Sequence, residues 1–181
     1  TEGKADPELM LRLTGMGVPM GLQYSVTAIG SVILQSAVNT LGSTAVAAVT
    51  ASGRISGFFV CPSDALGATM ATWAGQNMGA KKPKRIREGL RMANIYGIVY
   101  ALIAFGILAA AGKYMALLFV DGTDPELMNR IQQMLLINSG SYTFLILVNN
   151  VRFLIQGIGF STLAIFSGVS EMIARGIAGF V

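Results

Sequence analysis

The chain contains no histidine, and its charged side chains are few. Aspartate, glutamate, lysine and arginine make up 12% of its 181 residues, against roughly 25% in an ordinary soluble domain. The lack of histidine excludes a helical zinc-protease motif, a Ser/His/Asp triad and a Cys/His pair. The sequence also lacks a P-loop lysine motif, which argues against an ATP-driven pump within this chain. We therefore expect no catalytic residue and no metal site, and predict that the chain is not an enzyme.

Cysteine is nearly absent as well. Cys61, which stands beside Pro62, is the only cysteine, so no disulfide can form within the chain. We interpret it as a packing residue.

Apolar residues dominate the sequence. They make up 53% of the chain, and the mean hydropathy is +0.61. The few charges are unevenly distributed, because four stretches carry no ionised side chain, namely residues 13–53, 92–112, 131–151 and 153–170. A helix needs roughly 20 apolar residues to cross about 30 Å of hydrocarbon, and each stretch approaches or exceeds that length. The pattern predicts an all-α integral membrane protein, since a soluble all-α protein would need amphipathic faces that these segments mostly lack.

The first uncharged stretch is too long for one crossing, so it must turn. Its only polar break with a glycine is NTLGST at 39–44, and we place the turn there. The sequence then predicts five transmembrane helices, at 18–41, 45–79, 86–119, 125–158 and 162–181. Residues 1–17 are expected to be a cytoplasmic linker or interfacial segment, in which Asp6 and Pro7 begin a short helix. Residues 18–181 are expected to form a transmembrane helical lobe.

Positive charge gathers between the second and third predicted spans. The six basic residues there are Lys81, Lys82, Lys84, Arg85, Arg87 and Arg91. Lys4 and Arg12 precede the first span, so both groups belong on one side of the membrane, which the positive-inside rule makes cytoplasmic. The opposite connections agree, because 39–44 is neutral and 121–126 is acidic. We interpret the cluster as a topological anchor of a multi-pass protein in the plasma (cytoplasmic) membrane. Lipid headgroup binding is the alternative, and no nucleic acid partner is expected.

Two predicted spans carry stripes of polar side chains. The first span supplies Gln23, Thr27, Ser31, Gln35 and Asn39, and the fourth supplies Asn138, Tyr142, Asn149, Arg152 and Gln156. Their spacing places each set along one helix face. Because an unpartnered polar group that faces lipid is costly, the stripes either line a wet substrate cavity or join helices by hydrogen bonds. We favour the cavity.

Five ionisable residues within the predicted spans are candidates for function: Arg54, Asp64, Arg152, Glu171 and Arg175. Glu171 and Arg175 have the favourable i,i+4 order for an ion pair. At about 1.5 Å per residue from a turn near Phe160, Arg152 lies roughly 12 Å and Glu171 roughly 16 Å along adjacent helices. We therefore expect a buried network of Arg152, Glu171 and Arg175. It either neutralises charge and fixes helix register, or Glu171 exchanges a proton or a cationic substrate for its arginine partners.

Asp64 is the fourth candidate for ion coupling or for the buried charges, beside Arg152, Glu171 and Arg175. It follows Pro62 by two residues, and a proline within a helix frees a backbone carbonyl and bends the helix. A solvated position near the cytoplasmic surface is the alternative.

Longer motifs resemble a known family. The segment GMGVPMGLQYSVTAIGSVILQSAVNTLGSTAVAAVTASGRI, followed by a long helix that closes on WAGQNMGAKKPKRIREG, resembles the multidrug and toxic compound extrusion (MATE) transporters. Each half of these proteins shows an early proline, an LG and then AVAA connection, and a GQN-GA ending with basic residues. The segment VRFLIQGIGFSTLAIFSGVSEMIARGI is similar to the junction between the family's tenth and eleventh helices. The resemblance covers nearly the whole chain.

The resemblance implies that the chain is most of the second six-helix lobe, about helices seven to eleven, of a twelve-helix bilobed exporter. Its partners would be the N-terminal lobe and the last helix of the same protein, the lipid bilayer, and small cationic or amphipathic substrates. Members expel such compounds in exchange for sodium ions or protons, with no other cofactor. The sodium-coupled branch has acidic residues in helices seven and ten, whereas the nearby residues 24–30 and 142–150 contain none. We therefore expect coupling to reside in the missing lobe or at Glu171.

Three functions remain open. The leading one is secondary antiport of drugs or organic cations. A flippase for lipid-linked cargo of the same superfamily is the first alternative, and it would favour a more basic cavity than the uncharged amides suggest. A membrane assembly module without transport is the second, favoured if the polar stripes are buried in helix contacts.

Overall fold

The structure is a computed structural model that describes residues 6–160 and 162–180, and that part of the chain contains helices and no strand. The helices are α1 (Pro7–Asn39), α2 (Ser43–Gly79), α3 (Pro83–Ala116), α4 (Pro125–Gly140), α5 (Tyr142–Gly157) and α6 (Thr162–Phe180). The all-α prediction is confirmed. Lys4 and Val181 lie outside the described residues, as does the side chain of Arg12.

The predicted linker does not end in a short helix of its own. Asp6 caps α1 as expected, since its side chain accepts a hydrogen bond of 3.0 Å from the Glu8 backbone N–H, and Pro7 takes the first helical position. The helix then continues through Pro19 to Asn39. The prediction of a short helix followed by a separate span from residue 18 is wrong, because Glu8–Leu13 consists of good helix formers and a single proline did not end the helix.

The predicted fourth span is two helices. α4 and α5 meet at Ser141 and are bent by 44°. The break follows Gly140, and glycine–serine pairs are a recurrent cause of sharp helix kinks. The Ser141 hydroxyl donates to the Ile137 carbonyl at 3.2 Å, which supplies a local partner at the break. The prediction of one continuous helix over 125–158 is therefore corrected.

Fewer of the described helices than predicted are long and apolar enough to cross a membrane. By length and composition, α1, α2 and α3 are suited to span it, and α4 with α5 makes a fourth if the bent pair is one span. α6 was the fifth predicted span. It carries Glu171 and Arg175, and within the described residues it is not among the helices that qualify by length and composition.

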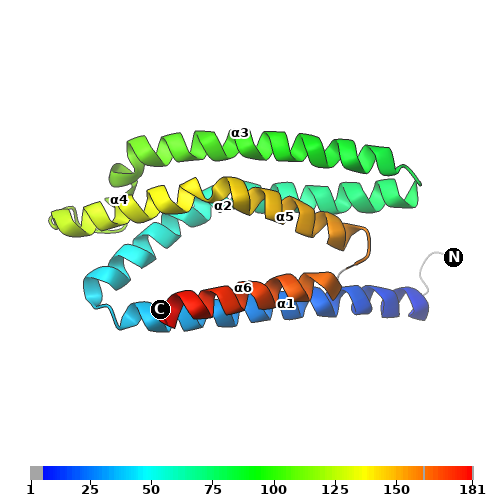
Figure 1. Cartoon of the computed structure of the whole chain (residues 1–181), viewed down its shortest axis with the longest axis horizontal. Helices are drawn as coiled ribbons and strands as arrows, with labels where there is room; N and C mark the ends of the chain where they lie inside the picture. The colour runs from blue at the N-terminus through cyan, green and yellow to red at the C-terminus, as the bar shows by residue number, and fades with distance from the viewer. Residues whose placement is uncertain (1–5, 161, 181) are drawn as a thin grey trace.

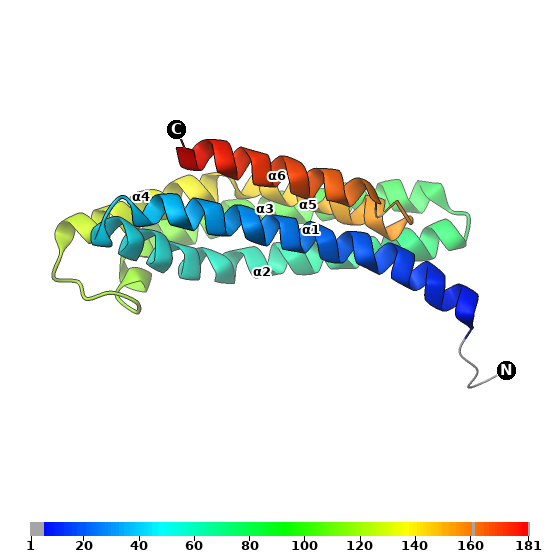
Figure 2. The same cartoon turned by 90° about the horizontal axis from the view of Figure 1, so that it is seen from below.

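The helices form two groups (Figures 1 and 2). α1 and α6 lie side by side and run parallel, since Gly30 approaches Met172 and Gly168 approaches Gln23. α2, α3, α4 and α5 pack on one another as the second group. Figure 1 shows that the connection from α1 to α2 and the connection from α5 to α6 lie at opposite ends of the molecule. Gly42 and Gly159 in these connections have positive φ angles of 92° and 99°, which glycine adopts without a steric penalty.

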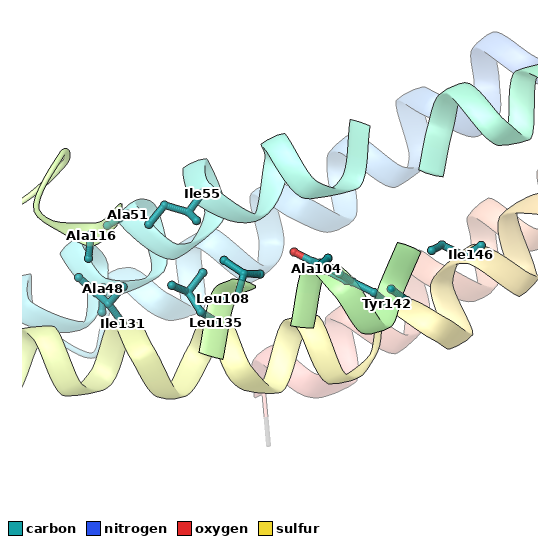
Figure 3. Packing of buried hydrophobic residues seen from close by; sticks show 11 residues of the cluster. Ala48, Ala51, Ile55, Ala104, Leu108, Ala116, Ile131, Leu135, Tyr142 and Ile146 are labelled. Carbon is teal, nitrogen blue, oxygen red and sulfur yellow. The ribbon is translucent and has the colours of Figure 1, made fainter. Parts of the chain in front are cut away.

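The apolar core lies in the second group (Figure 3). Its fully buried large side chains include Ile55, Leu108, Ile131, Leu135 and Ile146. Small residues such as Ala48 and Ala104 fill the spaces between them and allow the helices to approach closely. Among the described residues, no member of this core comes from α1 or α6. The α1/α6 pair is therefore attached to the other helices by different contacts.

Candidate functional site

A chain of polar contacts begins on α2 and crosses to α6. The Asp64 carboxylate accepts a hydrogen bond of 3.1 Å from the Asn149 side-chain amide of α5. The Asn149 side-chain oxygen accepts in turn from the Arg152 guanidinium. Arg152 Nη1 then lies 3.8 Å from Glu171 Oε2 on α6.

The same chain of contacts continues to α1. Glu171 Oε1 lies 2.6 Å from Arg175 Nη2, and Arg175 Nη1 donates to the Ser31 hydroxyl. Asp64, Asn149, Arg152, Glu171, Arg175 and Ser31 are thus joined in sequence from α2 through α5 and α6 to α1. We call these six residues the polar network. Two carboxylates and two guanidinium groups balance its formal charge, and it joins the two helix groups.

The polar network is only partly enclosed. The exposed fractions of the Arg152, Glu171 and Arg175 side chains are 20%, 33% and 35%, whereas Asn149 is buried. The Arg152 Nε is buried without a hydrogen-bond partner in the described part of the chain. A pocket of about 190 Å³ lies beside Arg152, between α5 and α6. It is large enough for a few water molecules but smaller than the roughly 300 Å³ at which ligand pockets begin.

Gln23 and Gln156 do not line an open cavity. The Gln156 amide nitrogen donates to the Gln23 side-chain oxygen at 2.9 Å, and both residues are buried. This hydrogen bond joins α5 to α1. The expectation that these two amides face a substrate cavity is corrected, because their positions on the two stripes meet where the helices cross.

The other residues of the two stripes lie in different surroundings. Tyr142 is buried beside the apolar core, and its hydroxyl donates to the Ser56 carbonyl at 3.4 Å, so its predicted cavity position is also corrected. Thr27 is half-buried, and its carbonyl accepts from the Ser31 hydroxyl at 3.1 Å. Gln35 is exposed and donates to the Asn39 side chain at 3.1 Å.

One buried amide pair was missed from the sequence. Asn150 is fully buried, and its side-chain nitrogen donates to the Asn94 side-chain oxygen at 3.0 Å, which joins α5 to α3. The side-chain oxygen of Asn150 has no partner among the described residues. Two consecutive asparagines in an uncharged, apolar stretch were the available signal, because one of them must face away from the stripe on which Asn149 lies.

The ionisable residues of the helices are not all joined. Arg152, Glu171 and Arg175 come together, and Asp64 reaches them through Asn149. Arg54 does not belong to the polar network. Within residues 6–160 and 162–180, no group of three or more acidic or cysteine side chains is placed to hold a metal ion.

Long apolar helices, joined by buried amides and by a charge-balanced polar network, define an all-α multi-pass membrane protein. The model of the MatE family matches residues 19–179. The chain therefore belongs to the MatE family of transporters.

Two relatives come from Bacillus subtilis (strain 168). The "Probable multidrug resistance protein YoeA" is 24% identical over 139 residues, which cover 77% of this chain and 30% of the relative. The "Probable multidrug resistance protein YpnP" is 29% identical over 109 residues, which cover 60% of this chain and 24% of the relative. The match thus spans less than a third of the length of each relative. No solved structure matches the chain.

Proposed function

We propose that the chain is part of a secondary transporter that expels drugs or organic cations across the plasma (cytoplasmic) membrane by antiport with protons or sodium ions. It would serve as most of the second lobe, working with an N-terminal lobe and a last helix. The names of the two relatives support drug efflux. The observation that carries the proposal is the polar network, in which Glu171 lies between two arginines at the junction of the two helix groups.

The position of Glu171 suits an exchange. While Glu171 is ionised, the polar network is neutral. The Glu171 carboxylate then attracts a cation in competition with Arg152 and Arg175. Once Glu171 carries a proton, positive charge is in excess by one, which disfavours a bound cation. Proton and cation therefore exclude each other at one carboxylate. Antiport requires this kind of mutual exclusion, since a ligand shifts an equilibrium only through its different affinity for the two states.

The contacts of the polar network also attach the α1/α6 pair to the other helices. Because no described core residue comes from these two helices, the polar bonds carry much of their contact with α5. Breaking the ion pair between Arg152 and Glu171 would loosen that attachment. In this proposal, occupancy at Glu171 is read out as a shift of one helix group against the other, in line with the rigid-body movement of repeats in secondary transporters.

The test compares the full-length transporter with its Glu171→Gln variant. Export of a fluorescent organic cation is followed in vesicles under an imposed proton gradient and, separately, a sodium gradient. We expect gradient-driven export by the wild type and its loss in Glu171→Gln. The matched control is Glu126→Gln, which removes the glutamate of an exposed i,i+4 pair with Arg130 and should leave export unchanged.

Each other result has a definite meaning. Unchanged export by Glu171→Gln would make the polar network a structural device that neutralises charge and fixes helix register. No export by the wild type under either gradient would count against drug antiport and favour the lipid-linked cargo.

A further inference from the structure

A second polar site lies at the connection between α1 and α2, next to the segment that follows α3. It is a pocket of about 590 Å³, within the range of about 300–1,000 Å³ that is usual for small-molecule sites. Its polar wall is formed by Asn39, Ser43, Thr50 and Arg54, and its apolar wall includes Phe119 and Val120. None of the described residues that line it is acidic.

Arg54 is the charged group of this pocket, and it differs from the two arginines of the polar network. Arg152 and Arg175 are both paired with Glu171. Arg54 is exposed, and no ion pair or hydrogen bond joins its side chain to any residue in the described part of the chain. The five N–H donors of its guanidinium group are therefore available.

The neighbouring polar groups add further donors. The Asn39 side-chain oxygen is occupied by the Gln35 amide, which leaves the Asn39 amide nitrogen to donate. Within the described residues, the hydroxyls of Ser43 and Thr50 have no hydrogen-bond partner. A positive charge surrounded by free donors is suited to an oxyanion, and a guanidinium group binds a carboxylate with two parallel hydrogen bonds.

We propose that this pocket binds the anionic group, a carboxylate or similar oxyanion, of an amphipathic substrate. Arg54 supplies the opposite charge, Asn39 and Thr50 donate hydrogen bonds, and Phe119 and Val120 contact the apolar body of the substrate. The inference rests on the proposed efflux function and adds to its cationic substrates amphipathic compounds that also carry a negative group, which are zwitterions.

The experiment uses the purified full-length transporter and two matched probes. One is a fluorescent rhodamine with a free carboxylate, and the other is its methyl ester, which differs only in lacking that negative charge. Binding is measured by fluorescence anisotropy without any ion gradient. Arg54→Gln should raise the Kd of the carboxylate probe about tenfold, because a charge-assisted hydrogen bond is lost, and should change the Kd of the ester less than about twofold. Arg54→Lys should give an intermediate Kd for the carboxylate.

Arg130→Gln is the matched control, since Arg130 is an exposed arginine outside both sites, and it should change neither Kd. Equal weakening of both probes by Arg54→Gln, or no weakening of either, would overturn the inference and would indicate that Arg54 pairs with an acidic residue elsewhere in the transporter. Failure of the wild type to bind the carboxylate probe would overturn it as well. Elution volume and thermal unfolding of both Arg54 variants show whether the fold is kept, and Arg54→Lys serves if Arg54→Gln does not fold.

The binding test of the pocket and the export test of the efflux function can fail independently of each other. Binding of the carboxylate that depends on Arg54, without export under either gradient, would support the pocket and refute antiport. Gradient-driven export of the ester, with carboxylate binding that does not depend on Arg54, would support antiport and refute the pocket.

Discussion

Single residues set how closely the helices of the second group approach each other. Gly157 of α5 lies against the backbone of α2, where an added Cβ would overlap the Ala71 carbonyl oxygen and lie 2.7 Å from the Ala71 Cα. Gly75 of α2 faces the Gly157 carbonyl in the same crossing. Small residues at such contacts allow backbones to touch, which is the usual means of helix association in membranes. This contact places Asn149 and Arg152 within reach of Asp64 and α6.

A methyl group at Gly157 should therefore destabilise the protein. We expect Gly157→Ala to lower the free energy of unfolding by about 1–3 kcal/mol, because a Cβ in contact with a backbone oxygen forces α5 away from α2. Thermal unfolding of the full-length transporter in detergent measures this change. Gly106→Ala is the control, since no atom lies within 4 Å of the Cβ that it adds to α3, and it should be neutral or slightly stabilising. Equal midpoints for the two variants would contradict the close contact.

The sequence predicted part of the site at this scale. Arg152, Glu171 and Arg175 were grouped from an i,i+4 spacing and from similar distances to one turn, which helix geometry fixes without knowledge of packing. The bond from Asn149 to Asp64 was not predicted, because it depends on how α5 crosses α2. For the same reason Gln23, Gln156 and Tyr142 were assigned to a cavity, since a stripe on a single helix does not reveal which neighbour covers it.

At the scale of whole helices, two kinds of contact hold the molecule together. The second group shares an apolar core, whereas α5 meets the α1/α6 pair through the Gln156–Gln23 bond and through the ion pair between Arg152 and Glu171. In a membrane, lipid solvates apolar helix faces as well as another helix does, so polar bonds and close packing decide which helices associate. The bond between the two glutamines should therefore contribute measurably to docking of the pair.

A double-mutant cycle on Gln23→Ala and Gln156→Ala isolates that contribution. We expect a coupling free energy of about 0.6 kcal/mol, the average for hydrogen bonds between helices in a membrane. Unfolding free energies of the wild type, the two single variants and the double variant provide the measurement. The matched control is the cycle on Gln35→Ala and Asn39→Ala, an exposed amide pair within α1, for which a smaller coupling is expected. A coupling between Gln23 and Gln156 no larger than that of the control would contradict their role in docking.

Helix ends were easier to predict than helix pairings. Pro125 occupies the first position of α4, where the fourth span was predicted to begin, whereas α2 begins at Ser43 and α3 at Pro83, two and three residues before the predicted starts. The break at Ser141 was missed, because the uncharged stretch around it shows no change in hydropathy. The parallel pairing of α1 with α6 was not predicted either, since these helices are far apart in the sequence and no local signal specifies their contact.

At the scale of the whole molecule, the basic and the acidic connections lie at opposite ends. The start of α1 and the basic connection between α2 and α3 lie at one end, and the acidic segment between α3 and α4 lies at the other (Figure 1). The six basic side chains between residues 81 and 91 are all exposed. At the basic end, the Trp73 indole N–H donates to the Arg85 carbonyl at 3.0 Å, and the Arg85 guanidinium lies 5.4 Å from the centre of that ring. An exposed, asymmetric charge of this kind orients a membrane protein with its basic end in the cytoplasm.

Labelling from outside the cell tests that orientation. In a cysteine-free background that includes Cys61→Ala, single cysteines are introduced as Lys82→Cys and Gly122→Cys, both at exposed positions. We expect a membrane-impermeant maleimide to label Gly122→Cys in intact cells and to label Lys82→Cys only after the membrane is permeabilised. The opposite order of labelling would reverse the orientation of the chain.

The two connections of the α1/α6 pair limit how it can move. α1 joins α2 at one end of the molecule and α6 joins α5 at the other, and the two helices run parallel between these points (Figures 1 and 2). The pair is therefore attached to the other helices at both ends of the molecule rather than at one end. Neither end can swing away freely, and the remaining freedom is rolling about the long axis. Such a roll would carry Ser31, Glu171 and Arg175 together past Arg152 of α5, and it would break or restore the contact between Glu171 and Arg152 with little displacement through the membrane.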